Sequence, residues 1–148
     1  MSRFIGSELC MLDAKGRINV PARMRRNIAP EANDTFVILR SFDPCVNLYP
    51  ADEFAQFDAR LTAALSDGDE DARDFARGIY ATAHEATLDS QGRLNIPDHL
   101  LEWAGVKKES MLIGNKSHLE LWNLKTYEQR AASLDQVRLN NYAKRFLP

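Results

Sequence analysis

The chain has few cysteines, no long apolar run and little net charge, and each absence excludes a class of protein. None of its apolar runs approaches the roughly 18 residues that a membrane-spanning helix needs. The first residues lack the apolar segment of a secretory signal peptide, so we expect a cytoplasmic protein. Cys10 and Cys45 have no Cys or His neighbour at metal-ligand spacing, which predicts two buried free thiols in a reducing compartment.

The sequence also lacks the patterns that mark catalytic and metal sites. Its three histidines, His84, His99 and His118, are scattered, which is typical of structural histidines and not of metal ligands. There is no glycine-rich phosphate loop and no nucleophile elbow. The carboxylates form no pair that the sequence identifies as a general acid and base. We therefore expect no metal, no cofactor and no enzymatic activity.

An internal repeat is the most informative feature that is present. The segment LDAKGRINVP at residues 12–21 returns as LDSQGRLNIP at residues 88–97, and six of the ten positions are identical. A repeat of this kind predicts two copies of one small unit, here residues 1–75 and 76–148. A half-chain of this size buries only a modest core, so we expect the copies to pack closely about a pseudo-twofold axis.

Each copy has the pattern of a strand, a turn, a second strand, a short helix, a hairpin and a longer helix. Asp-x-x-Gly is turn chemistry, and the alternating Arg-Ile-Asn-Val that follows predicts a half-buried strand. The predicted hairpins cover residues 36–49 and 111–122, and a linking helix is expected over 72–80. The longer helices follow Pro50 and begin at Leu124, the second continuing towards Phe146. Both are amphipathic and offer apolar contacts between copies of the chain through Leu61, Leu65, Tyr127, Ala131 and Leu134.

Charge is distributed unequally between the copies, although the formal net charge is only −2. Residues 13–28 contain five basic side chains and one acidic one, whereas the equivalent residues 89–104 contain one arginine and three acids. A further acidic block occupies residues 67–71. Binding follows the local field, so a polyanion is expected to meet the first copy. Arg17 is therefore expected to matter more for binding than Arg93.

The repeated strand has the side chains of a DNA reader. Arg17 and Asn19 lie on the strand face opposite Ile18 and about 7 Å apart, and Arg93 with Asn95 repeats the arrangement. Arginine can read guanine O6 and N7 in the major groove, and asparagine can read adenine N6 and N7. A two-stranded ribbon fits that groove. Lys15 at the turn tip, with Arg23 and Arg26 on one face of the short helix, is placed for phosphates.

Structural interpretations of the same residues stand beside the functional ones. Asp13 and Arg17 can form an ion pair that fixes the turn, and for Asp13 this interpretation is favoured because an acid gains nothing from a phosphate. Arg17 fits both roles. The arginines of the short helix can form a solvated face, but the second copy has Asp98 and Glu102 there, so the fold does not require the charge.

The chain resembles the bacterial MraZ family from about Arg3 to about Tyr127. The resemblance is carried by LDAKGR at residues 12–17, its second copy LDSQGR at 88–93, PCVNLYP at 44–50 and LELW at 119–122. It implies the swapped-hairpin fold of AbrB-type transcription factors. It also implies a DNA-binding regulator of the division and cell-wall gene cluster that assembles as a ring on tandem promoter repeats. The family's motifs fall on Asp13 with Arg17 and Asp89 with Arg93.

Together these observations predict an α+β protein of two tandem AbrB-like swapped-hairpin half-motifs, forming a small pseudo-twofold β-barrel with flanking helices. The predicted function is sequence-specific binding of double-stranded DNA by a nucleoid-associated homo-oligomer. The alternative is an interaction scaffold or toxin-neutralising module, which would tolerate the loss of Arg17. The candidate DNA-binding residues are Lys15, Arg17, Asn19, Arg23, Arg26, Arg93 and Asn95, and the residues expected to shape the motif are Asp13, Gly16, Asp89 and Gly92.

Overall fold

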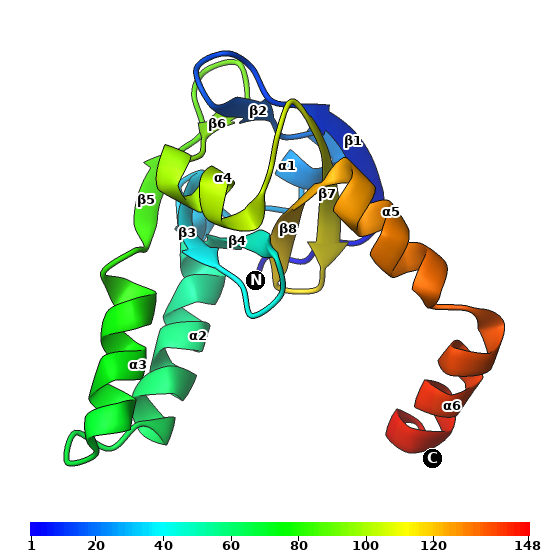
Figure 1. Ribbon diagram of the computed structural model, residues 1–148. Helices are drawn as coiled ribbons and strands as arrows, with labels where there is room; N and C mark the ends of the chain where they lie inside the picture. The colour runs from blue at the N-terminus through cyan, green and yellow to red at the C-terminus, as the bar shows by residue number, and fades with distance from the viewer.

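The computed structural model describes residues 1–148 and has the predicted α+β composition (Figure 1). The first copy contains β1 (Ser7–Met11), β2 (Arg17–Asn19), α1 (Ala22–Arg25), the short 3-10 helix η1 (Pro30–Ala32), β3 (Thr35–Arg40), β4 (Cys45–Pro50) and α2 (Ala51–Ala64). There follow α3 (Glu70–Tyr80), β5 (His84–Thr87), β6 (Arg93–Asn95), α4 (Asp98–Ala104), β7 (Glu109–Asn115), β8 (His118–Asn123), α5 (Leu124–Ser133) and α6 (Gln136–Phe146). No helix is both long enough and apolar enough to cross a membrane.

Strands of the two copies alternate in one antiparallel sheet of order β1-β7-β8-β4-β3-β5. When each strand is replaced by its counterpart in the other copy, the same order is obtained, read from the opposite edge. The sheet therefore has pseudo-twofold symmetry. The first strand of each copy pairs with the hairpin of the other: β1 lies beside β7, and β5 lies beside β3. The copies are therefore interleaved in space.

The predicted barrel is not closed. The six-stranded sheet is open and has β1 and β5 at its edges, while β2 and β6 form a separate two-stranded ribbon. The reason lies in the repeated turn: after β1 and after β5 the chain turns sharply and leaves the sheet, so the two edges do not pair with each other. The ribbon lies at the end of the molecule that is uppermost in Figure 1.

The main core joins the ribbon to the large sheet. It contains 18 buried residues, among them Ile18 and Leu94 from the ribbon and Phe36, Leu48 and Leu119 from the sheet. Fully burying a side chain of this kind stabilises the fold by about 1.5–3 kcal/mol. Since both copies contribute, neither half has a core of its own.

A smaller cluster holds α2 against the sheet. Phe57 and Leu61 of α2 pack on Val37 and Tyr49, and the Tyr49 and Phe57 ring centroids are 5.2 Å apart. Helix α3 runs alongside α2 and adds Ile79 to the cluster (Figure 1). Leu61, one of the residues that we expected to meet another copy, thus packs within the chain.

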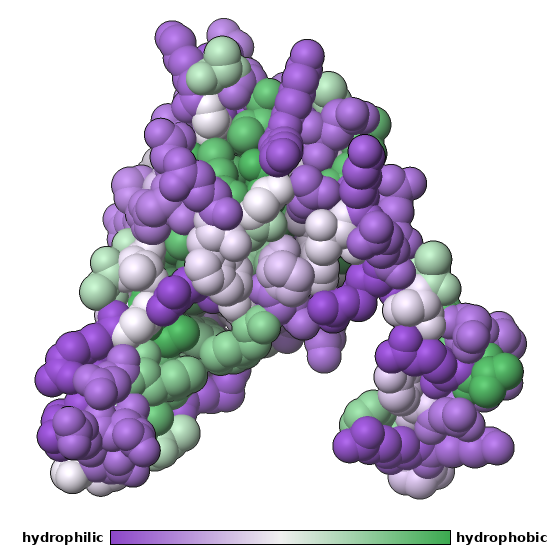
Figure 2. Space-filling model, viewed as in Figure 1, coloured by the Kyte–Doolittle hydropathy of each residue, from purple (hydrophilic) through white to green (hydrophobic).

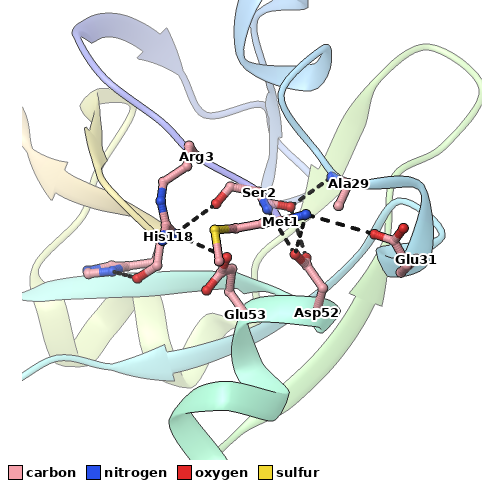
Figure 3. Close-up of polar contacts among 9 residues, drawn as sticks. Met1, Ser2, Arg3, Ala29, Glu31, Asp52, Glu53 and His118 are labelled. Atoms are coloured by element: carbon pink, nitrogen blue, oxygen red, sulfur yellow. Dashed lines mark hydrogen bonds and ion pairs between the residues drawn. The ribbon is translucent and has the colours of Figure 1, made fainter.

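The N-terminal segment is fixed to the start of α2 (Figure 3). The fully buried Ser2 donates its backbone N–H and its hydroxyl to the two carboxylate oxygens of Asp52, both at 2.9 Å. The hydroxyl also accepts from the backbone N–H of Ala29 at 2.8 Å, and Arg3 pairs with Glu53 at 3.1 Å. These contacts anchor the chain just before β1.

The C-terminal region is two helices where one continuous helix was expected. Leu134 leaves the helical conformation with φ −89° and ψ 74°, and Asp135 then caps α6 by accepting from the backbone N–H of Arg138 at 2.9 Å. Aspartate favours such a cap because its carboxylate satisfies a free N–H of the first turn. Neither α5 nor α6 buries any residue, and α6 projects away from the body of the molecule (Figure 1).

Both cysteines are buried free thiols, as predicted. Burial is the main cause that raises the pKa of Cys10 to about 11 and the pKa of Cys45 to about 12. At neutral pH both thiols are therefore protonated and poor nucleophiles.

Candidate nucleic-acid interface

The ribbon gathers four of the predicted site residues on one face. In the antiparallel pair, Arg17 lies opposite Asn95 and Asn19 lies opposite Arg93. The central pair, Ile18 and Leu94, is fully buried on the other face. Because side chains alternate along a strand, the two arginines and two asparagines share the outer face. The sequence predicted each strand separately, and the fold combines them into a single twofold surface.

Each ribbon strand is preceded by a turn that is held by its aspartate. Asp13 accepts from the backbone N–H groups of Lys15 and Arg17, both at 2.9 Å, and from Nε of Arg17 at 2.8 Å. Asp89 makes the same three bonds at the same lengths to Gln91 and Arg93. The hydrogen bond from the backbone N–H of Arg17 is the largest cause that lowers the pKa of Asp13. The equivalent bond from Arg93 is the largest cause that lowers the pKa of Asp89 to about 2. The turns are thus formed by ionised carboxylates.

The glycines of these turns take a conformation that other residues rarely adopt. Gly16 and Gly92 both have φ +77°, in the left-handed region. Their carbonyls accept from the other copy: Ile96 N–H donates to Gly16 at 2.8 Å, and Val20 N–H donates to Gly92 at 3.0 Å. Each turn is thereby bonded to the strand end of its partner, which fixes both loops at the same end of the molecule (Figure 1).

The ends of the two repeated arginines are available to a ligand. Arg17 and Arg93 use only Nε within the chain, and their terminal nitrogens make no hydrogen bond. The side chains are 25% and 30% exposed. Each arginine can therefore fix its turn and still present two N–H-bearing nitrogens to an outside acceptor.

Arg23 does not have the freedom that the sequence suggested. Its Nε pairs with Glu8 at 3.1 Å, and its two terminal nitrogens each donate at 3.2 Å to the carbonyls of Ile5 and Ser7. All three nitrogens have partners in the segment around β1. Arg23 therefore holds that segment in place. The side chains of Lys15 and Arg26, in contrast, make no hydrogen bond or ion pair within the chain.

The short helices are exchanged between the copies, so each lies beside the turn of the other copy. Helix α1 lies against the second turn, where Arg25 and Arg26 line a hollow with Asp89 and Gly92. The first turn faces α4 instead, with Asp98 beside Gly16. Arg25 and Arg26 of the first copy therefore lie beside the turn of the second motif. The exchange arises because the end of each ribbon strand is bonded to the other copy's turn, through Val20 N–H to Gly92 and Ile96 N–H to Gly16, and the short helix begins just after it.

Arg25 is the residue near the site that the sequence analysis did not select. In the sequence Arg25 is only one residue of a basic stretch, because its counterpart in the second copy is Leu101 and the repeat therefore carries no signal at this position. Its importance follows from the placement of α1, which depends on contacts between residues far apart in the sequence.

No group of three or more His, Cys, Asp or Glu side chains is arranged to hold a metal ion. His118 lies 3.6 Å from a carboxylate oxygen of Glu120 and stacks on Tyr49, and His99 contacts the Thr82 carbonyl at 3.0 Å. These histidines have partners in the fold itself.

Comparison with known proteins gives a consistent result over nearly the whole chain. A family model described as "MraZ protein, putative antitoxin-like" matches twice, at residues 4–78 and 79–147. A protein of Halothermothrix orenii is 34% identical over 145 residues, covering 90% of this chain and 98% of the relative. Proteins of Corynebacterium urealyticum and Shewanella violacea are 37% and 36% identical, covering 88% and 95% of this chain and 87% and 93% of their own lengths. All three relatives carry the name "Transcriptional regulator MraZ".

Proposed function

This chain belongs to the MraZ family, and from that membership we propose that it regulates transcription by binding double-stranded DNA sequence-specifically through the β2–β6 ribbon. One observation carries the proposal: Arg17, Asn19, Arg93 and Asn95 share the outer face of a two-stranded ribbon whose inner face is buried. Such a ribbon can enter the major groove.

Each side chain on this face has a defined task in the proposal. Arg17 and Arg93 donate to guanine O6 and N7, and Asn19 and Asn95 read adenine N6 and N7. Lys15 at the first turn contributes a phosphate contact. Asp13 and Asp89, with the glycines of their turns, hold the loops in shape. The two repeats, residues 1–75 and 76–148, thus form one binding surface for a pseudo-symmetric DNA site, and the protein acts at the nucleoid.

We further propose that the protein acts as a ring-shaped homo-oligomer on tandem promoter repeats of the division and cell-wall cluster. Two unpartnered surfaces support assembly. Helix α6 exposes apolar side chains, including Val137 at 68% and Phe146 at 64% (Figure 2). A groove of about 370 Å³, whose lining includes the aromatic side chains of Phe42, Phe75 and Trp103, lies beside α3.

Charge favours these two surfaces as partners. Helix α6 carries Arg138, Lys144 and Arg145 and no acidic residue. The region beside the groove has an excess of acidic residues. Asp67, Asp69, Glu70, Asp71 and Asp74 outnumber Arg73 and Arg77 of α3 and Arg40 of the groove. One chain's α6 in the next chain's groove is a heterologous contact, and such contacts generate rings when the rotation closes. Several linked ribbons would then gain affinity on adjacent repeats.

The test is fluorescence anisotropy with the purified protein and a duplex taken from upstream of its own gene, at several salt concentrations. Binding should weaken steeply with salt, since each phosphate contact contributes about 0.9 to the slope of log K against log salt. Arg17→Ala should remove the preference for this duplex over a scrambled one. Affinity that stays constant from low to physiological salt would contradict the proposal.

A second candidate function, a protein-interaction or toxin-neutralising module, has one observation in its favour. Helices α5 and α6 bury no residue within the chain, as expected of a segment that docks on another protein. Loss of Arg17 separates the two functions, because a partner held by α6 would still bind while DNA would not.

A further inference from the structure

Arg25 is a half-buried arginine without any partner in the chain. Its Nε is inaccessible to solvent and makes no hydrogen bond, and none of its nitrogens forms an ion pair. A buried donor without an acceptor is unfavourable, and an ion that binds beside it is one explanation of such a group in a native protein. The other two arginines near α1 differ: Arg23 is fully bonded, and Arg26 is exposed.

The guanidinium of Arg25 lies over the second turn. A Cβ built on Gly92 would be 2.6 Å from Cζ of Arg25 and 3.0 Å from its Cδ, so the side chain occupies the space that this glycine leaves open. Arg25 borders two neighbouring hollows. One contains Ser90 and Gly92, and the other contains Asn19 of the ribbon. Its charge therefore lies between a base-reading side chain and the loop of the second motif.

The acidic residues nearby do not pair with Arg25. Asp89 lines the same hollow, but its two oxygens already accept three hydrogen bonds from Gln91 and Arg93. Asp34 also lines it and is exposed to solvent. Glu8 lines the other hollow and pairs with Arg23 at 3.1 Å. The two arginines and two aspartates that line this hollow balance in formal charge, but the N–H groups of Arg25 have no acceptor, which suits an oxygen anion that can take a bidentate contact.

We propose that Arg25, with Arg26 beside it, clamps one DNA backbone phosphate next to the second turn, so that the first copy's helix completes the second copy's DNA contact. This inference rests on the proposed DNA-binding function. It also accounts for an otherwise odd difference between the turns. The first turn has its own basic residue, Lys15, where the second has Gln91, and the second turn receives Arg25 where the first faces Leu101. Each turn then has one phosphate contact, from a different source.

The experiment compares the salt dependence of DNA binding for Arg25→Met, Arg25→Lys and the unmodified protein. Methionine keeps an unbranched stem over Gly92 and removes the charge, while lysine keeps the charge. Arg60→Gln is the matched control, because Arg60 is exposed on α2, which projects away from the ribbon (Figure 1).

For Arg25→Met we expect the negative slope of log K against log salt to become shallower by about 0.9 for each bound chain. The affinity loss per chain should then be about 3.5-fold larger at 50 mM salt than at 200 mM. Arg25→Lys should keep most of the slope, and Arg60→Gln should keep all of it.

An unchanged slope in Arg25→Met, with the unmodified protein binding normally, would overturn the clamp and leave the proposed function standing. If the unmodified protein does not bind DNA, the proposed function itself fails. Should Arg25→Met not fold, phenylglyoxal labelling of the unmodified protein gives the answer. Bound duplex should protect Arg25 from modification and leave Arg60 reactive, and equal labelling of Arg25 with and without DNA would overturn the proposal.

Discussion

Replacing Leu94 with alanine tests whether the ribbon is sealed onto the core. Leu94 is fully buried and lies opposite Ile18, which is also fully buried. Truncating a buried leucine costs about 2–5 kcal/mol, the higher values applying where the surroundings cannot collapse into the cavity. The ribbon strands are three residues long and bonded at both ends to the turns, so little collapse is available. We therefore expect a loss of about 3–5 kcal/mol, in the upper part of that range.

The loss of unfolding free energy is measurable by urea unfolding and the shift in Tm by thermal unfolding, both followed by circular dichroism. For a chain of this length, about 1 kcal/mol corresponds to roughly 2–4 °C in Tm, so Leu94→Ala should lower Tm by about 6–20 °C. Ile18→Ala should have a similar effect. Combining the two should cost less than their sum, because residues that share a cavity are coupled by about 0.5–3 kcal/mol.

Leu9→Ala is the control for this experiment. Leu9 is 52% exposed on the edge strand β1, and its truncation should change stability by no more than about 0.5 kcal/mol. If Leu94→Ala cost as little as Leu9→Ala, the ribbon would not be packed on the core, and the orientation of its reading face would be wrong.

Three further predictions follow from the site and its surroundings. Arg17→Ala and Arg93→Ala should weaken specific binding to similar extents, each by about 5–150-fold, since each removes one bidentate base contact of about 1–3 kcal/mol; a much smaller loss for Arg93→Ala in anisotropy assays would restore the sequence-based asymmetry. Val137→Glu, at a side chain 68% exposed on α6, should lower the mass measured by analytical ultracentrifugation while the chain stays folded by circular dichroism, and a monomeric unmodified protein at micromolar concentration would contradict assembly. Because the pKa of Asp89 is lowered from 3.8 to about 2, its contribution to stability is present above about pH 4 and is lost as the pH falls towards 2, and Asp89→Asn should flatten Tm against pH in this window.

The local elements could be predicted from the sequence because their signals are local. The Asp-x-x-Gly turn, the alternation around Ile18 and the prolines before α1 and α4 each act within a few residues, and the structure has these elements where the patterns predicted them. The outward direction of Arg17 and Asn19 followed from the same alternation.

The pairing of these elements could not be predicted in the same way. The register that places Arg17 opposite Asn95 depends on packing between β2 and β6, which are 76 residues apart in the sequence. Neither strand alone specifies this register. The exchange of α1 and α4 between the turns has the same origin, and it places Arg25 and Arg26 of the first copy beside the second turn. The break before α6 was a smaller omission, since Asp135 is a recognisable helix cap.

The interleaving of the strands has a consequence for how this protein is made. Cys10 of β1 lies beside Ser110 of β7, and the two residues are 100 positions apart. At a synthesis rate of roughly 5–20 residues per second, β1 stays unpaired for on the order of 5–20 s before its partner strand β7 has been synthesised. During that time the first half has unpaired strand edges and an uncovered apolar face. We expect the nascent chain to need protection from aggregation until the second copy emerges, and a chain truncated after the first copy to be insoluble on its own.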